Sequence, residues 1–473
     1  MNRKLFHRIY PELQFFVPET PSSPLPASPA VEAAPTHPSF GEAFKYWLKL
    51  GFINFGGPTG QIAIMHTDLV EKKRWVSETR FLHALNFCML LPGPEAQQLA
   101  TYIGWLLHGT RGGIVAGALF VLPGALLLWL LAYVYMAHGS ITWIAAIFYG
   151  LQPAVVAIVA NATMRLAHRA LKNYVMYGLA IAAFVALFFF KVPFPWIIGS
   201  AAFIGIAGGK ILPKRFVFTA GHASKDTSSV INDAYMNEPH LQPSNLRFIT
   251  ILLLGGVIWW VPVLLVGQWA GFQSMPCEQG VFFGSAALVT FGGAYAVLEF
   301  VKQHFVFNAK WISAQEFQAG MAQAETTPGP LIMVLQFVGF AAGWHSPLPG
   351  WSPFATATLC AAITTWTTFV PSFIFILLGA PYIEKLRGHA GLSSALSAIT
   401  AAVVGVIANM AVWFAQQVLF PTADQAGTSW RLDGFALAVA LVGFLGLWRL
   451  KWDIHSVVIG AALMGLVYKL ILH

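Results

Sequence analysis

Charged side chains are scarce in this chain, and this scarcity decides its class. Only 10% of the 473 residues are Asp, Glu, Lys or Arg, whereas 57% are hydrophobic. In a soluble domain about a quarter of the residues are charged. The composition therefore excludes an ordinary soluble protein and predicts an all-α polytopic protein embedded in a lipid bilayer.

Cysteine is also scarce, and the common catalytic motifs are missing. Cys88, Cys277 and Cys360 lie far apart and form no CxxC or Cys/His cluster, so neither a disulfide framework nor a metal site is expected. No Walker loop, zinc-protease helix, nucleophile elbow or dinucleotide-binding loop occurs. These absences disfavour an ATP-driven pump and a soluble-type enzyme. We expect no catalytic residues and no cofactor.

The formal net charge of +8 raises the alternative of a nucleic-acid partner. The basic residues, however, stand in short clusters between apolar runs, which is the distribution that sets membrane topology. We therefore expect no nucleic-acid binding.

Two short motifs recur at a constant spacing of 236 residues. Pro92-Gly93-Pro94 recurs as Pro328-Gly329-Pro330, and Phe55-Gly56-Gly57 recurs as Phe291-Gly292-Gly293. The same offset pairs three further residues, Trp75 with Trp311, Ser77 with Ser313 and Phe81 with Phe317. Identities clustered on Gly, Pro, Trp and Phe exceed what a hydrophobic composition produces by accident. The sequence therefore predicts a tandem duplication.

The duplication divides the chain into five predicted parts. Residues 1–39, with eight prolines from Pro11 to Pro38, predict a disordered tail, and no apolar segment there resembles a cleaved signal peptide. The other parts are a first repeat over 40–212, a polar cytoplasmic linker over 213–247, a linking transmembrane helix over 248–268 and a second repeat over 277–473.

Most apolar runs are near the roughly 20 residues that a membrane-spanning helix needs. In the first repeat they cover about 113–137, 141–166, 173–190 and 194–209, after a loop at 109–113. In the second repeat they cover about 354–379, 391–416, 433–448 and 455–472, after the interrupted stretches 280–309 and 311–343.

The joins between spans indicate the topology. His138-Gly139-Ser140 carries no Lys or Arg, whereas Arg165, Arg169 and Lys172 follow the next span, so the latter join is predicted to be cytoplasmic. The interrupted stretches 44–72 and 81–108 are then best interpreted as re-entrant hairpins, and the rival interpretation is a single crossing by a broken helix. The extra span at 248–268 inverts the second repeat. The predicted fold is a tandem inverted-topology repeat with broken or re-entrant helices, an architecture of secondary transporters.

The breaks are also where a ligand is expected. Two prolines around a glycine end any helix, and the helix that restarts presents free backbone N–H groups and a positive dipole end, which favour an anion. The alternative is that the breaks only kink helices for packing. The candidate substrate-binding residues are Gly56, Gly57, Pro58, Gln61, Pro92, Gly93, Pro94, Glu95, Gln98, Gly292, Gly293, Glu325, Thr327, Pro328, Gly329 and Pro330.

Two of these candidates, Glu95 and Glu325, are ionisable groups in membrane segments, where they are costly and point to function. The alternative is an ion pair with a basic residue such as Arg111 or Lys302. Asn161 and Asn409 occupy matching places in two similar runs, and we expect them to bond between helices.

The sequence resembles the chromate transporter family from Phe40 to the C-terminus. The resemblance rests on Phe55-Gly56-Gly57-Pro58, on residues 71–77, on Leu91-Pro92-Gly93-Pro94, on residues 291–298 and on residues 327–332. It implies a multi-pass protein of the bacterial cytoplasmic (inner) membrane that exports chromate and confers chromate resistance, with sulfate as the related oxyanion and with a homodimer as an alternative to a monomer. A sulfate or other oxyanion importer or exchanger is the nearest rival. A chromate-reducing membrane enzyme would need a redox cofactor motif, and the sequence has none.

Overall fold

The fold is built from helices. The computed structural model describes residues 35–55, 57–216, 229–231, 241–291, 293–382, 390–421 and 432–472, and within these the chain forms no strand, only one isolated bridge between Val76 and Ile231. Gly56, Gly292, most of the predicted linker and the charged residues at 384–387 lie outside the described residues.

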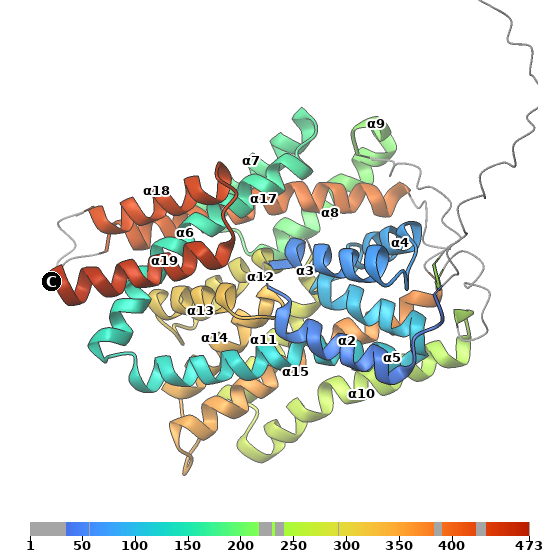
Figure 1. The fold of residues 1–473 in the computed structure, drawn as a ribbon, viewed down its shortest axis with the longest axis horizontal. Coiled ribbons are helices and arrows are strands. Elements are labelled where there is room, and N and C mark those ends of the chain that lie inside the picture. Colours follow the sequence, from blue (N-terminus) through green and yellow to red (C-terminus); the bar gives the residue numbers. More distant parts are fainter. Residues whose placement is uncertain are drawn as a thin grey trace, which may run out of the picture. The chain divides into compact units, whose positions relative to one another are not determined.

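The helices form two series in the same order, drawn in Figure 1. The first series is α2 (Phe40–Ile53), α3 (Gly57–His66), η1 (Thr67–Lys72), α4 (Glu78–Cys88), α5 (Glu95–His138), α6 (Thr142–Ala170), α7 (Tyr174–Phe188) and α8 (Phe194–Ile211). The second is α11 (Met275–Val289), α12 (Ala294–Val301), η4 (Lys302–Asn308), α13 (Ala314–Thr326), η5 (Leu331–Met333), α14 (Val334–His345), α15 (Pro353–Gly379), η6 (Ala380–Tyr382), α17 (Ala390–Leu419), α18 (Gly434–Trp448), α19 (Ile454–Val467) and η7 (Tyr468–Leu472). Between them lie α9 (Pro213–Phe216) and α10 (Asn245–Ala270).

Equivalent residues start equivalent helices. Ser77 caps α4 by accepting a hydrogen bond from the N–H of Arg80, and Ser313, 236 residues later, caps α13 in a capping box with Glu316. Residues other than glycine with positive φ also occur in equivalent pairs, namely Arg74 with Lys310 and Lys191 with Lys451. The local signals that end and restart the helices are therefore duplicated along with the motifs.

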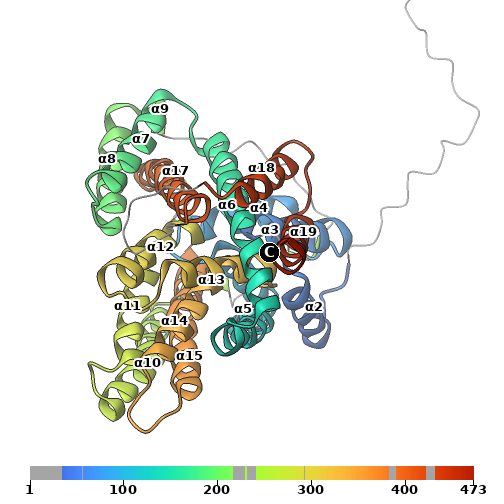
Figure 2. The same ribbon diagram turned by 90° about the vertical axis from the view of Figure 1, so that its left-hand side faces the viewer.

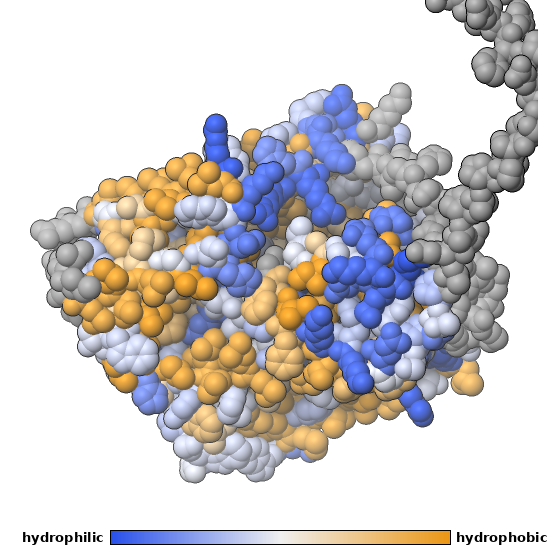
Figure 3. All heavy atoms as spheres, viewed as in Figure 1, coloured by the Kyte–Doolittle hydropathy of each residue, from blue (hydrophilic) through white to orange (hydrophobic). Residues whose placement is uncertain are grey.

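The predicted spans agree well with the helices. Six helices in the described part of the chain are long and apolar enough to cross a membrane, namely α5, α6, α8, α10, α15 (with η6) and α17, and α7, α14, α18 and α19 are shorter apolar helices. The linking helix α10 keeps only 17% of its most apolar window buried and leaves Leu253 64% exposed. On the face drawn in Figure 3, hydrophobic side chains gather over α18 and α19, whereas hydrophilic side chains gather around α4. Apolar surface of this extent fits contact with lipid.

The predicted loop at 109–113 is too long. Only His108 and Gly109 leave the helical conformation, and Gly109 has a φ of +60°. The two arms of α5 pack antiparallel beyond this break, since a Cβ on Gly117 would meet Thr101 and one on Gly113 would meet Trp105. The glycines that suggested a loop therefore serve close helix packing.

Each interrupted stretch folds back on itself at its break. Lys73, after η1, lies 4.0 Å from Glu42 at the start of α2, and its ammonium lies over the Tyr46 ring. In the second series, His345 at the end of α14 contacts Glu316 at the start of α13 at 2.6 Å. The two ends of these stretches meet, so one hairpin in each series carries its break at its tip. Figure 1 shows α3 and α4 approaching the middle of the helical region from one end and α13 and α14 from the other.

The two series exchange contacts reciprocally. Helix α6 packs against α18 and α19, while its equivalent α17 packs against α7 and α8. Helices α6 and α17 also pack together and run antiparallel, because Tyr149, early in α6, donates a 2.6 Å hydrogen bond to Asp433, whose N–H donates to the carbonyl of Leu419 at the end of α17. Reciprocal contacts of this kind are those of a two-fold interface.

Candidate functional site

The four breaks meet in the interior of the protein. The N–H of Gly93 donates to the carbonyl of Thr290 at 2.8 Å, and the N–H of Gly329 donates to the carbonyl of Asn54 at 3.4 Å. Asn54 and Thr290 are equivalent residues, as are Gly93 and Gly329, so each Pro-Gly-Pro turn binds the backbone just before the Gly-Gly break of the other repeat. The two repeats are therefore joined at their breaks.

A small, partly enclosed cavity lies at this junction. Every one of the four breaks contributes to its wall. The lining residues are Pro58, Gln61, Pro94, Glu95, Ala96, Gly293, Ala294, Pro330, Leu331 and Ile332.

Helix N-termini supply most of this wall. Helix α5 starts at Glu95 after Pro94, α12 starts at Ala294 after Gly293, and η5, which continues into α14, starts at Leu331 after Pro330. None of these three N-termini has a side-chain cap. The first N–H groups of a helix have no hydrogen-bond partner within the helix. Their partial positive charge can therefore attract a negatively charged group in the cavity.

Glycine is required where the helices restart after the Gly-Gly breaks. Gly57 has a φ of +67° and its equivalent Gly293 a φ of +95°, a conformation that other residues rarely adopt. A Cβ on either glycine would meet no atom within 4 Å, so both face open space. The positive φ, not a lack of space, therefore explains the glycine at both positions.

Gln61 joins the two repeats beside the cavity. Its side chain is 1% exposed, and its Nε2 donates to the carbonyl of Asn54 at 2.8 Å and to that of Gly329 at 2.6 Å. Among the described residues, its Oε1 has no hydrogen-bond partner. The second repeat has Val297 at the equivalent position, so this polar contact belongs to the first repeat only.

The structure divides the predicted residues into two groups. The residues that line the cavity are Pro58, Gln61, Pro94, Glu95, Gly293 and Pro330. Outside the lining lie Gly57, Pro92, Gly93, Gln98, Glu325, Thr327, Pro328 and Gly329. Several of these hold the turns in place, as when Gln98 Nε2 donates to the carbonyl of Pro92 at 2.7 Å. Gly56 and Gly292 lie outside the described residues.

Sequence reasoning missed four lining residues, Ala96, Ala294, Leu331 and Ile332. They carry no polar side chain, so no side-chain chemistry marked them. Their position could nevertheless have been predicted from the sequence, because each lies in the first helical turn after a predicted break.

The two carboxylates have different surroundings. Glu95 lies in the cavity wall, whereas Glu325 accepts a 2.6 Å hydrogen bond from the hydroxyl of Tyr295. Among the described residues, no basic nitrogen lies within 4 Å of either carboxylate. The alternative that Lys302 pairs with one of them is wrong, because Lys302 pairs at 2.6 Å with Glu299, and both side chains are almost fully buried.

Asn161, one of the two matching asparagines, differs from expectation. After its amide is turned, the oxygen of Asn161 accepts from Arg165 Nη2 at 3.2 Å and from Nε at 3.3 Å. Arg165 is on the same helix as Asn161, α6. This bond therefore orients the side chain of Arg165 and does not join two helices.

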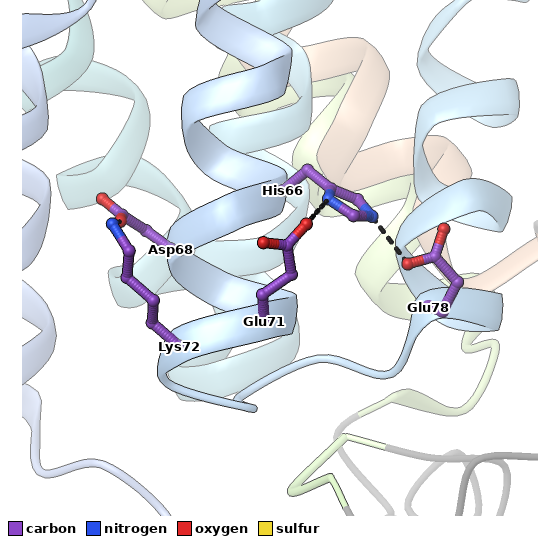
Figure 4. Close-up of polar contacts among 5 residues, drawn as sticks. All are labelled: His66, Asp68, Glu71, Lys72 and Glu78. Carbon is purple, nitrogen blue, oxygen red and sulfur yellow. Dashed lines mark hydrogen bonds and ion pairs between the residues drawn. The ribbon is translucent and has the colours of Figure 1, made fainter.

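A second polar cluster, shown in Figure 4, lies away from the breaks. The imidazole of His66 contacts Glu71 through Nδ1 at 3.2 Å and Glu78 through Nε2 at 2.6 Å, and Lys72 pairs with Asp68 at 2.9 Å. His66 is equivalent to Lys302. In each repeat, therefore, a basic residue at this place is held by carboxylates, and in the first repeat it connects the first hairpin to α4.

The sequence of this chain is similar to those of known transport proteins. A chromate transport protein of Cupriavidus metallidurans is 27% identical over 94% of this chain and 97% of its own length, and one of Pseudomonas aeruginosa is 28% identical over 92% and 94%. The uncharacterized transporter YwrA of Bacillus subtilis is 26% identical, covering 96% of its own length but only 36% of this chain. No solved structure matches the chain.

The model of the chromate transporter family matches twice, at residues 41–206 and again at 278–466. The two matches cover both helical series and all four breaks that line the cavity. The chain is therefore a member of the chromate transporter family.

Proposed function

We propose that this protein is a secondary transporter that exports chromate from the bacterial cytoplasm across the inner membrane and so confers chromate resistance. The observation that carries the proposal is the cavity at the junction of the repeats, with uncapped helix N-termini of both repeats in its wall. The proposal is one of transport rather than catalysis, and related proteins are named as transport proteins.

The chemistry of the wall suits an oxyanion. Several backbone N–H groups at helix N-termini can each donate to an oxygen of a tetrahedral dianion, and the aligned helix dipoles favour its charge. Within a membrane these donors have no water as an alternative partner, so a ligand that satisfies them gains more than it would at a protein surface. The apolar residues between them exclude water from the remaining wall.

The membrane potential favours one direction of anion transport, namely export. A dianion that leaves a cell of negative interior gains about 2.3 kcal/mol per charge per 100 mV, hence roughly 4.6 kcal/mol. Export is therefore downhill in potential, whereas import of the same ion needs an opposing gradient.

We further propose that the two repeats have inverted topology, related by a two-fold axis in the membrane plane. Three observations support this proposal: the equivalent helices α6 and α17 run antiparallel, the contacts between the series are reciprocal, and the hairpins of the two series approach the junction from opposite ends. Such a frame lets one central site open to either side by rocking of the repeats.

Uptake or exchange of sulfate, or of another oxyanion, is the second candidate. The specific observation in its favour is that, of the described residues in the cavity wall, two have polar side chains, Gln61 and Glu95, and the rest offer backbone groups. Backbone donors recognise the tetrahedral shape and charge that sulfate and chromate share.

Transport in inverted membrane vesicles tests these proposals. An exporter should accumulate labelled chromate when the vesicle interior is made positive, because inversion places the cytoplasmic face outside. Labelled sulfate is measured in parallel, and right-side-out vesicles report uptake into the cell. Accumulation only in right-side-out vesicles under a cation or proton gradient would contradict export, and accumulation of sulfate without chromate would replace the substrate.

A further inference from the structure

Two arginines of α6 lie beside the junction on one side only. Arg165 and Arg169 are both exposed and stand four residues apart, so they share one face of the helix. Helix α6 packs against α13, the helix of Glu325, and Figure 2 shows it passing beside α13 and α18.

Arg169 contacts a residue beside one break, and the charge of Arg165 acts on a residue beside another. Arg169 donates to the sulfur of Met89 at 3.7 Å, just before the first Pro-Gly-Pro turn, and it attracts the carboxylate of Glu95 in the cavity wall. Arg165 interacts electrostatically with Tyr295, which lies next to the cavity-lining Ala294. The pair therefore spans the first break of one repeat and the second repeat's α12.

Neither guanidinium is neutralised by a close acid. Among the residues that the structure describes, no carboxylate oxygen lies within 4 Å of Arg165 or Arg169. The bond from Arg165 to Asn161 fixes the side chain without cancelling its charge. Two exposed positive charges beside the cavity, without a close acid among the described residues, can bind an anion before it enters.

The other repeat lacks this feature. The positions of α17 equivalent to Arg165 and Arg169 carry Trp413 and Gln417. Trp413 is 8% exposed and lies under the ammonium of Lys302 at 4.8 Å, which is itself paired with Glu299. The duplicated site therefore has its positive pair on one face only.

We propose that Arg165 and Arg169 form the cytoplasmic receiving site for the transported oxyanion, which holds the dianion before it passes to the cavity at the four breaks. Arginine suits this role because its planar fork can donate two parallel hydrogen bonds to two oxygens of one tetrahedral anion. The inference rests on the proposed function, since it assigns the side from which the substrate is loaded. The structural alternative is that the two arginines only complement the C-terminal dipole of α6 and set topology.

Sided transport kinetics separate these roles. Arg165→Gln and Arg169→Gln should each raise the chromate concentration for half-maximal uptake about tenfold in inverted vesicles, the loss of one charge-assisted contact. The maximal rate should stay near the wild-type value. In right-side-out vesicles, where chromate enters from the α17 side, half-saturation should not change. Lys172→Gln removes a charge from the same join and should leave both values unchanged.

Each other outcome has a defined meaning. Equal changes from both sides, or equal effects of Lys172→Gln, would overturn the inference and leave the arginines a structural or topological role. Wild-type vesicles that transport neither chromate nor sulfate would overturn the proposed function itself. Arg165→Lys and Arg169→Lys keep the charge, so topology should be preserved, and a persistent rise in half-saturation with these variants would identify the bidentate contact.

Discussion

The backbone N–H of Gly93 lies 2.8 Å from the carbonyl oxygen of Thr290 and donates a hydrogen bond to it across the two repeats. The equivalent bond runs from Gly329 to Asn54. Because each Pro-Gly-Pro turn is also bonded to the other repeat, movement of one repeat should shift both sets of helix N-termini. The cavity is therefore built where a rocking motion would change it most.

Gly93→Ala should damage this junction. Gly93 has a φ of +127°, and a Cβ there would lie 2.5 Å from Ser372 Oγ and 2.7 Å from Gln98 Nε2. Strain and overpacking together should cost about 1–3 kcal/mol of stability, which thermal unfolding in detergent would detect. The double variant Gly93→Ala, Ser372→Gly should regain part of the loss, because it removes one of the two contacts. No regain would mean that the strain in φ dominates.

Gly57→Leu and Gly293→Leu should abolish transport while leaving the protein in the membrane. Both glycines restart helices at positive φ, so a branched side chain would be strained at either position. At Gly293, which lines the cavity, it would also occupy space that the anion needs. Transport and membrane abundance are measured together. Gly178→Leu is the matched control, since Gly178 is an exposed helical glycine whose Cβ would also meet nothing within 4 Å. Normal chromate resistance in either junction variant would reduce these breaks to a packing role.

The inverted topology predicts opposite labelling of two sites. A cysteine at Ser140 should react with an impermeant reagent from outside intact cells, and one at Gly388 should not. Gly388 lies outside the described residues, so Gly391, exposed at the start of α17, serves as a second cytoplasmic position. The native cysteines are all buried, which keeps background labelling low. Reaction at both Ser140 and Gly391 from outside would refute the topology.

Breaking the buried pair of Glu299 and Lys302 should lower the stability of the protein strongly, whereas replacing both residues should change it little. Its side chains are 2% and 3% exposed and 2.6 Å apart. Lys302→Met alone leaves an unpaired buried carboxylate and should lower stability by about 3–5 kcal/mol. Lys302→Met with Glu299→Gln should lie much closer to the wild type. If the double variant is stable but inactive, the pair contributes to transport. If the double variant is as unstable as the single one, an unpaired carboxylate is not the cause.

Much of the fold could be predicted from the sequence because its signals are local. Proline, glycine and serine at constant spacing marked the breaks and caps, and hydrophobic runs marked the spans. The turn at His108 and Gly109 was predicted less well, because glycines such as Gly112 and Gly113 that allow close helix packing look the same in sequence as glycines of a loop. Local composition cannot separate these two uses of glycine.

The site was predictable only in part. Its motifs were found, but the bonds from Gln61 to Gly329 and from Gly93 to Thr290 join residues far apart in the chain, and no local pattern specifies them. The partner of Lys302 was available in the sequence, since Glu299 stands three residues before it on the same helical face. The nearby carboxylate formed the pair, and Glu325 was left to Tyr295.

Glu95 is expected to couple proton and anion. It lies in the cavity wall at the N-terminus of α5, where a carboxylate and a bound dianion repel each other across a poorly solvated space. Chromate binding should therefore favour protonated Glu95, and by linkage protonation should tighten chromate binding. Affinity in the wild type should then rise as the pH falls. Proton and anion would leave together, with the inward proton gradient opposing export.

Glu95→Gln separates this role from its alternative. The amide mimics the neutral acid, so a coupling role predicts that chromate still binds and that the pH dependence contributed by Glu95 between about pH 5 and 8 is lost. The alternative is that ionised Glu95 only orients Arg169, and then the variant should lose the site. Sulfate is measured beside chromate, because sulfate stays a dianion over this range whereas chromate itself takes up a proton toward its acid end. A pH dependence of sulfate binding that survives in Glu95→Gln would exclude Glu95 as the coupling group, because the remaining titration would then belong to another residue.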